Sequence, residues 1–266
     1  MIRKAPAFAA IIMALGLAPA LAGDKPGADV MAELPDGYVA EESLPDSLVL
    51  IPPVPSYGSM RQSLDDASAA AAIALQGTAR FELARQDADL SFPDAPNVFA
   101  CALGARMSEE ETPRLLNLML RSLVDSGLST YGAKTSYQRN RPFMVNGAPF
   151  CTPEEEEALR GDGSYPSGHT AVGWAWALIL SELAPDRADA ILARGLAYGE
   201  SRIICNVHWR TDVVAGRMMG AAAVALMHNS DDFIADMKAA RAEIRTASAP
   251  DVAECNAEAA ALAIKP

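Results

Sequence analysis

The chain has 266 residues, which is enough to bury one sizeable hydrophobic core. It contains 34 Asp and Glu against 22 Lys and Arg, so the formal net charge is −12 at pH 7. A protein this acidic is not expected to bind nucleic acid as its main task.

The first 22 residues have the pattern of a secretory signal peptide. Arg3 and Lys4 precede an apolar stretch that runs to Leu17, and Ala20-Leu21-Ala22 forms a small-x-small cleavage site. A membrane anchor is the alternative, but the apolar core is short for crossing a bilayer. We therefore expect a periplasmic or secreted protein whose mature chain begins at Gly23.

The rest of the chain is expected to contain no membrane span and two disulfides. Its most apolar stretches, residues 171–180 and 213–227, are too short or are interrupted by Arg217. The cysteines include no Cys-x-x-Cys pair of the kind that binds zinc, and their even number in an exported protein favours disulfides. Three pairings remain open among Cys101, Cys151, Cys205 and Cys255.

The N-terminal part of the mature chain shows little regular patterning. Residues 23–44 are rich in Gly, Pro and Asp, which predicts a loose arm. Residues 48–59 are apolar but are broken by three prolines. This composition predicts an extended strap and not a sheet strand.

From Ser63 onward the sequence predicts one helix after another. Residues 63–88 are rich in alanine and begin with capping residues. Residues 112–127 place Thr112 at an N-cap, Pro113 at the first helical position and Gly127 past the end. The same order recurs over residues 152–163, with Thr152, Pro153 and Gly161.

Strand-type alternation of Val, Ile and Thr is scarce, so the predicted fold class is all-α. A single-domain helical bundle is expected over residues 45–247, a length that needs no further division. Residues 248–266 form an alanine-rich tail, which is expected to be helical with Cys255 tying it down.

Three groups of polar residues stand out as candidates for chemistry. In the last of them, His208 and Asp212 are four residues apart, so they would face the same side of a helix. A carboxylate that binds one imidazole nitrogen leaves the other free to act as a base or nucleophile. A surface His-Asp pair is the plainer alternative, but Arg202 nearby favours a site that takes an anionic ligand.

The other two groups supply further anion-binding features. Pro166-Ser167-Gly168 leads into a helix that starts near His169, and the exposed amides of a helix N-terminus bind anions. Ser167 is suited to cap that helix or to donate to a bound oxyanion. Lys134 and Arg141 add an ammonium and a guanidinium suited to phosphate, although solvated surface charge is the usual role of such residues.

Together these groups match a family pattern. Lys134-x6-Arg141-Pro142, Pro166-Ser167-Gly168-His169 and Ser201-Arg202-x5-His208-x3-Asp212 resemble the signature of the superfamily that joins type 2 phosphatidic acid phosphatases to vanadium haloperoxidases. The segments "GSYPSGHT" and "SRIICNVHW" look most like those of the bacterial class A non-specific acid phosphatases. The resemblance covers roughly residues 45–247.

The resemblance implies a role for each matched residue. His208 would be the nucleophile that forms a phosphohistidine, with Asp212 orienting it, and His169 would be the general acid and then the general base. The phosphate oxygens would be held by Lys134, Arg141, Arg202, Ser167 and the amide of Gly168. The implied activity is hydrolysis of small phosphomonoesters of broad range, with an acidic-to-neutral pH optimum.

No cofactor is expected, because no Asp, His and Cys residues have metal-ligand spacing and three cations with a helix N-terminus can neutralise a phosphate. Three other functions stay open: a vanadate-dependent haloperoxidase, a lipid phosphatase of the same superfamily, and a non-catalytic periplasmic phosphate-binding protein. Short length disfavours the first. The sequence leaves the preferred substrate and any homo-oligomer undecided.

Overall fold

The computed structural model describes residues 35–265, and helices are the regular elements over that range. The predicted all-α fold class is confirmed, whereas the predicted signal peptide lies outside the described residues. Short 3-10 helices are η1 (Glu41–Ser43), η2 (Ala95–Phe99), η3 (Pro153–Glu155) and η4 (Pro185–Arg187). The α-helices are α2 (Ser47–Leu50), α3 (Met60–Ile73), α4 (Ala79–Gln86), α5 (Ala100–Leu103), α6 (Pro113–Leu128), α7 (Tyr131–Tyr137), α8 (Pro142–Asn146), α9 (Glu156–Gly161), α10 (Gly168–Leu183), α11 (Ala188–Ile204), α12 (Arg210–Met227), α13 (Asp231–Ile244) and α14 (Val252–Ala263).

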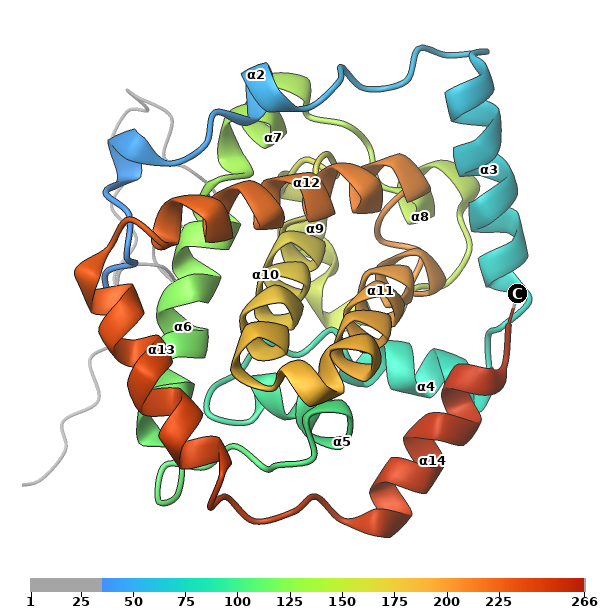
Figure 1. Cartoon of the computed structure of the whole chain (residues 1–266). Helices are drawn as coiled ribbons and strands as arrows, with labels where there is room; N and C mark the ends of the chain where they lie inside the picture. The colour runs from blue at the N-terminus through green and yellow to red at the C-terminus, as the bar shows by residue number, and fades with distance from the viewer. Residues whose placement is uncertain (1–34, 266) are drawn as a thin grey trace, which may run out of the picture.

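Helix α10 is the central element of the bundle. It packs against α6, α11 and α12, and α13 covers the outer side of α6 (Figure 1). The sequence of α10 is apolar on nearly every face, as expected for a helix that others surround. Trp176 and Leu180 are fully buried, and each such side chain contributes about 1.5–3 kcal/mol by leaving water.

Two glycines of α12 allow that helix to contact the beginning of α10. A Cβ atom at Gly216 would lie 2.4 Å from the carbonyl oxygen of Ser167, and one at Gly220 would lie 2.3 Å from that of Ala171. Any other residue would therefore push the helices apart. The contact is completed by the Ser167 amide, which donates to the carbonyl oxygen of Asp212 at 3.0 Å.

Several helix boundaries differ from the sequence prediction. The alanine-rich segment begins earlier, at Met60 after the cap Ser59, and is divided before α4 at Gly77, whose φ is +76°. Gly127 lies inside α6, which continues to Leu128. Thr112 holds the predicted N-cap position, but its hydroxyl accepts from the Ser108 amide at 2.8 Å and makes no cap hydrogen bond.

The segments before α3 are more ordered than predicted. The strap begins as a helical turn, α2, because Asp46 accepts from the Leu48 amide at 2.8 Å and caps it. Residues 35–44 of the predicted loose arm contact the bundle through Tyr38, whose hydroxyl donates to Asp236 at 2.8 Å. The amide of Tyr38 also donates to the buried carboxylate of Asp125 at 2.8 Å. Long-range hydrogen bonds therefore hold this segment despite its composition.

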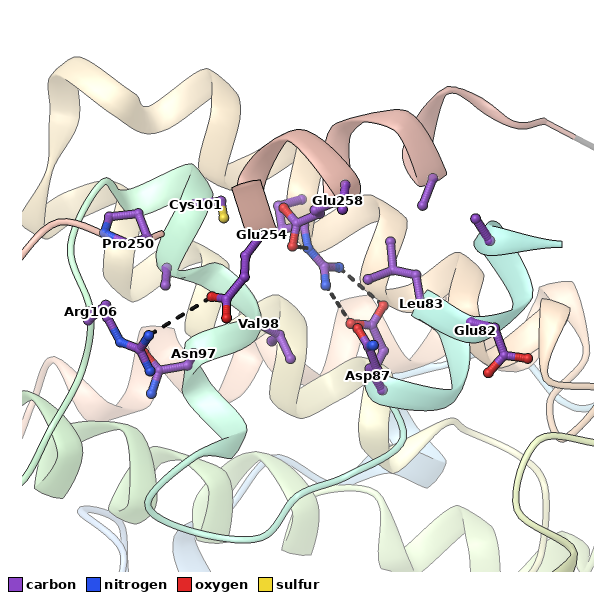
Figure 2. A pocket seen from close by; sticks show the side chains of 16 residues that line it. Glu82, Leu83, Asp87, Asn97, Val98, Cys101, Arg106, Pro250, Glu254 and Glu258 are labelled. Atoms are coloured by element: carbon purple, nitrogen blue, oxygen red, sulfur yellow. Dashed lines mark hydrogen bonds and ion pairs between the residues drawn. The ribbon is translucent and has the colours of Figure 1, made fainter. Parts of the chain in front are cut away.

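The two expected disulfides are confirmed, and the structure selects the pairs Cys101–Cys255 and Cys151–Cys205. The first joins α14 to α5, so the tail is helical and tied down as predicted. Residues of α14 line a pocket (Figure 2), which has a volume of about 590 Å³. Arg194, which also lines it, pairs with Asp87 and Glu258. Between residues 35 and 265 no helix has the length and hydropathy needed to cross a bilayer.

Candidate active site

His208 lies in the turn between α11 and α12, where it is 2% exposed. The chain reverses at Asn206, which has a φ of 60°, a conformation that asparagine adopts more readily than most residues. The Nδ1 atom of His208 lies 2.8 Å from the carbonyl oxygen of Ser164. Because a carbonyl only accepts, Nδ1 carries the proton and Nε2 keeps its lone pair.

Asp212 supports this turn as the third residue of α12. Its carboxylate accepts from the Trp209 amide at 2.8 Å and from the hydroxyl of Ser164, and it lies 3.5 Å from Nδ1 of His208. The spacing predicted that His208 and Asp212 share one face of a helix. This is wrong, because α12 begins only at Arg210 and His208 lies before it. Asp212 thus orders the peptide and hydroxyl groups around His208 more than it binds the ring.

Arg139, which the sequence interpretation left without a role, connects Asp212 to a second buried carboxylate. Its Nη1 donates to Asp212 at 2.6 Å and its Nη2 donates to Asp65 at 2.7 Å. Both carboxylates are 0% exposed. Burial raises the pKa of Asp212 to about 6, and the Arg139 guanidinium opposes that rise. No motif marks Asp65, which lies in α3, so tertiary packing alone identifies it.

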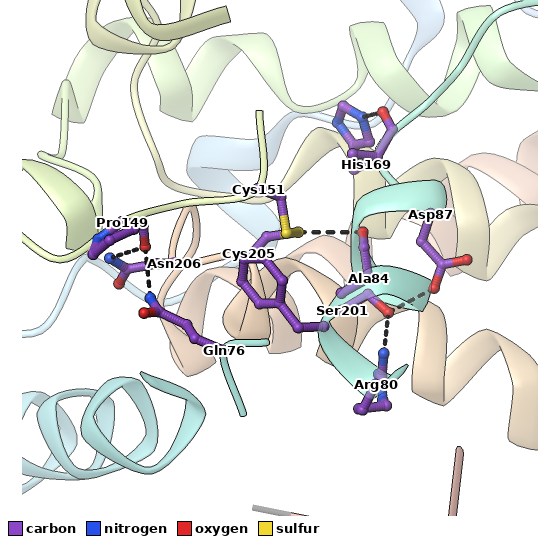
Figure 3. The surroundings of a disulfide bond; sticks show 12 residues. Gln76, Arg80, Ala84, Asp87, Pro149, Cys151, His169, Ser201, Cys205 and Asn206 are labelled. Atoms are coloured by element: carbon purple, nitrogen blue, oxygen red, sulfur yellow. Dashed lines mark hydrogen bonds between the residues drawn. A yellow bond between two sulfur atoms is a disulfide. The ribbon is translucent and has the colours of Figure 1, made fainter. Parts of the chain in front are cut away.

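His169 is the second residue of α10, directly after Gly168. Its Nε2 lies 3.0 Å from the carbonyl oxygen of Ala88 and must donate to it, so Nδ1 is the ring nitrogen that can exchange a proton (Figure 3). Ser167 is the N-cap of the helix, because its hydroxyl accepts from the Thr170 amide at 3.2 Å. The amide of Gly168, at the first helical position, meets no acceptor among residues 35–265.

Lys134 and Arg141 lie together, 4% and 2% exposed. The Lys134 ammonium donates to the carbonyl oxygen of Gly163 and to the Asp162 carboxylate, both at 2.7 Å. The Arg141 Nη1 donates to Nε2 of His208 at 3.1 Å, so the lone pair of that nitrogen accepts a hydrogen bond from this guanidinium. Burial lowers the pKa of Lys134 to about 8, although Asp162 opposes the decrease.

Arg202 is the most unusual cation of the group. It is 1% exposed, yet its Nε and Nη1 meet no acceptor among the described residues. Burial lowers the pKa of this guanidinium to about 10. A buried cation with unpaired donors is rare in proteins and indicates a place for an anionic ligand.

The residue before Arg202 holds the end of α11 in place. Ser201 donates to the buried Asp87 carboxylate at 2.6 Å and accepts from Arg80 Nη1 at 3.0 Å (Figure 3). Asp87 also precedes Ala88, whose carbonyl binds His169. The end of α4 therefore positions both Arg202 and His169.

The surroundings keep both histidines neutral. Burial lowers the pKa of His208 well below its usual value, and Arg141, Lys134 and Arg202 lower it further. Burial and then Arg202 lower the pKa of His169 in the same way. A neutral His208 retains the lone pair on Nε2 that a nucleophile requires.

The structure brings all eight predicted site residues together, and it adds Arg139, Asp65, Ser164 and Asp162. In residues 35–265 no three His, Cys, Asp or Glu side chains are grouped so that they could hold a metal ion. Three buried cations, a helix N-terminus and a neutral imidazole in one place are a set of groups that can bind an oxyanion beside a histidine.

Comparison with known proteins identifies the family. The sequence model of the PAP2 superfamily matches residues 115–234. An acid phosphatase of Zymomonas mobilis is 41% identical over 81% of this chain and 83% of its own length. Non-specific acid phosphatases of Providencia stuartii and Salmonella typhimurium are 41% and 36% identical and are covered over 88% and 86% of their lengths. The chain belongs to the acid phosphatase family of the PAP2 superfamily.

Proposed function

We propose that this protein is an exported, metal-independent acid phosphatase that hydrolyses small phosphomonoesters of broad range through a phosphohistidine. The observation that carries the proposal is the buried, unpaired guanidinium of Arg202 beside the neutral His208. Arg202 has donors to offer a phosphate, and His208 has a lone pair to attack one. The family supports the same reaction, since the relatives named above are acid phosphatases.

In the first step, Arg141 Nη1 exchanges its hydrogen bond to His208 Nε2 for one to the phosphoryl group. The lone pair of Nε2 then attacks phosphorus and the bond to the ester oxygen breaks. The leaving oxygen takes the electron pair and receives a proton from Nδ1 of His169. Lys134, Arg141, Arg202 and the Gly168 amide stabilise the charge that develops on the phosphoryl oxygens. A bound phosphate dianion offsets the nearby cations, and this favours the protonated His169 that the step needs.

In the second step, water attacks phosphorus and transfers a proton to Nδ1 of His169. The phosphorus–nitrogen bond breaks, and its electron pair returns to His208. Inorganic phosphate leaves, and His169 then releases the proton that it took up when the substrate bound, which restores the free enzyme. Nδ1 of His208 stays bound to the Ser164 carbonyl throughout, so the ring keeps one orientation in both steps.

The central test is His208→Ala. Turnover of p-nitrophenyl phosphate should be abolished, while binding of inorganic phosphate should persist because the cations and the Gly168 amide remain. Unmodified enzyme quenched in base should yield phosphohistidine at residue 208, detected by mass spectrometry. Turnover that survives the substitution would show that another group attacks phosphorus.

Two parallel measurements address the other parts of the proposal. Activity should persist in EDTA, and activity that disappears in chelator and returns with added metal would contradict metal independence. Export should give a mature protein that begins at Gly23, as determined by N-terminal sequencing. Bromide oxidation with vanadate and peroxide should stay at background, which distinguishes the phosphatase from a haloperoxidase.

A further inference from the structure

Asp162 places a carboxylate directly on two of the cations proposed to bind phosphate. Its Oδ2 atom accepts from Lys134 Nζ at 2.7 Å and from Arg141 Nη2 at 3.0 Å. Asp162 follows α9 and belongs to no motif that the sequence interpretation used. The Asp162 carboxylate therefore accepts hydrogen bonds from N–H donors that we propose bind phosphate.

The carboxylate is not needed to hold those cations in place, because backbone oxygens do so. Arg141 Nε donates to the carbonyl oxygens of Leu159 at 2.8 Å and of Asp162 itself at 3.2 Å, and Nη1 donates to that of Val207 at 3.1 Å. Lys134 Nζ donates to the carbonyl oxygen of Gly163 at 2.7 Å. These acceptors remain whatever side chain residue 162 carries.

Exposure differs sharply across this group. The side chain of Asp162 is 30% exposed, whereas those of Lys134 and Arg141 are 5% and 2% exposed. An ionised carboxylate at that position can turn toward water without being buried unpaired, but the two cations cannot leave. Lys134 and Arg141 are therefore fixed donors, whereas the Asp162 carboxylate is an acceptor that another anion can replace.

We propose that Asp162 competes with phosphate for Lys134 and Arg141, and so lowers the affinity of the site for phosphate and for phosphate-bearing substrates. The inference rests on the proposed function for the identity of the ligand. A phosphoryl oxygen needs the same N–H donors that Asp162 Oδ2 accepts from, so binding requires the carboxylate to give them up. The same competition assists the release of inorganic phosphate, the last product of the reaction.

Asp162 has a second effect that agrees with exchange between two anions. Its negative charge opposes the lowering of the Lys134 pKa by burial, so it keeps the ammonium protonated until phosphate takes over that task. A buried ammonium without any anion would tend to lose its proton. Lys134 therefore has an anionic partner both before and after phosphate binds.

The test is the dissociation constant of inorganic phosphate for Asp162→Asn, measured by titration calorimetry on the full-length enzyme near pH 6, which is below the pKa of about 8 that Lys134 has when Asp162 is present. We expect phosphate to bind at least about tenfold more tightly, a change of about 1.4 kcal/mol. The KM for p-nitrophenyl phosphate should fall in parallel. An unchanged or weaker affinity would overturn the proposal, since it would mean that the carboxylate positions the cations.

Glu155→Gln is the matched control. Glu155 is exposed and close enough to influence the pKa values of Arg141 and Arg202, but its side chain makes no hydrogen bond to either. If Asp162 acts by direct competition, removing the charge of Glu155 should change phosphate affinity much less than Asp162→Asn does. An equal gain in both variants would refute competition and indicate general repulsion.

Asp162→Ser provides a second variant in case the asparagine rotates back onto the cations or the protein folds poorly, with thermal melting as the check on folding. The outcomes also separate this inference from the proposed function. If Asp162→Asn binds phosphate more tightly but the unmodified enzyme shows no turnover, the role of Asp162 is supported and the phosphatase activity is refuted. If the unmodified enzyme turns over normally but Asp162→Asn has unaltered phosphate affinity, the phosphatase activity is supported and the role of Asp162 is refuted.

Discussion

Asp212→Asn distinguishes two ways in which a carboxylate can assist His208. In a triad the carboxylate binds the ring and sets its tautomer, and its amide replacement reduces kcat by about 10⁴-fold. Here the carbonyl oxygen of Ser164 binds Nδ1 at 2.8 Å, while the carboxylate is 3.5 Å away. The tautomer should therefore survive the substitution, because the carbonyl still requires a donor.

The expected loss comes from weaker hydrogen bonds around the turn. Asp212 accepts from the Trp209 amide and the Ser164 hydroxyl through one oxygen and from Arg139 through the other. An asparagine directs its NH2 group at one of these donors, and one charge-assisted hydrogen bond is worth about 1.5–3 kcal/mol. At 1.36 kcal/mol per factor of ten, kcat should fall about 10- to 150-fold.

The assay is kcat for p-nitrophenyl phosphate near pH 7, between the pKa of Asp212 at about 6 and that of Lys134 at about 8. Thermal melting is the check on folding and His208→Ala is the inactive reference. Ser164→Ala is the matched control, since it removes the hydroxyl but leaves the carbonyl that binds Nδ1, and it should lose less activity than Asp212→Asn. Nitrogen NMR of His208 reports the tautomer directly. A loss near 10⁴-fold together with a proton shifted to Nε2 would refute this reasoning.

Three further predictions concern stability and pH. Arg139→Gln leaves the buried Asp65 and Asp212 without a cation, so the free energy of unfolding in denaturant should fall by about 3–5 kcal/mol. As a control, Arg160→Gln breaks an exposed ion pair and should change the free energy of unfolding by less than about 1 kcal/mol. Equal losses in the two variants would contradict a stabilising role for the buried ion pairs of Arg139. The pKa of Lys134 is lowered to about 8, so the ammonium deprotonates as pH rises through that value and the affinity for inorganic phosphate should fall there. Lys134→Arg should move this decline to higher pH, and an unmoved decline would assign it to another group. The disulfide Cys151–Cys205 closes a separation of 54 residues, so its loss should lower the free energy of unfolding by about 4 kcal/mol on the chain-entropy relation. The measurement is the free energy of unfolding of the Cys151→Ser/Cys205→Ser variant. No change would mean that the disulfide constrains the unfolded chain little.

The sequence was informative where a local rule decides the structure. Ser167 caps α10 because a hydroxyl before a helix satisfies an orphan amide, and this depends on neighbouring residues only. The apolar run of α10 likewise predicts a buried helix. The boundaries near Gly127 and Leu48 were wrong because packing and the Asp46 cap outweighed the signals of Gly and Pro.

The site shows the same division. Motif spacing identified His208, His169 and the cations, but it assigned Asp212 to the wrong geometry, because the cap that starts α12 lies after His208. Asp65 and Asp162 carry no signal in the sequence. Each acts through a residue far along the chain, Asp65 on Arg139 and Asp162 on Lys134.

The sequence by itself determined the helical class, which follows from helix periodicity and capping. Through its resemblance to a family it also pointed to the residues that we propose carry the chemistry. Only the tertiary structure decided which cysteines pair, which ring nitrogen of each histidine carries the proton and which carboxylates contact the cations. Those properties depend on hydrogen-bond partners that lie many residues apart. Buried polar groups must find such partners or a ligand, and Arg202 is the cation for which the described part of the chain supplies none at Nε and Nη1.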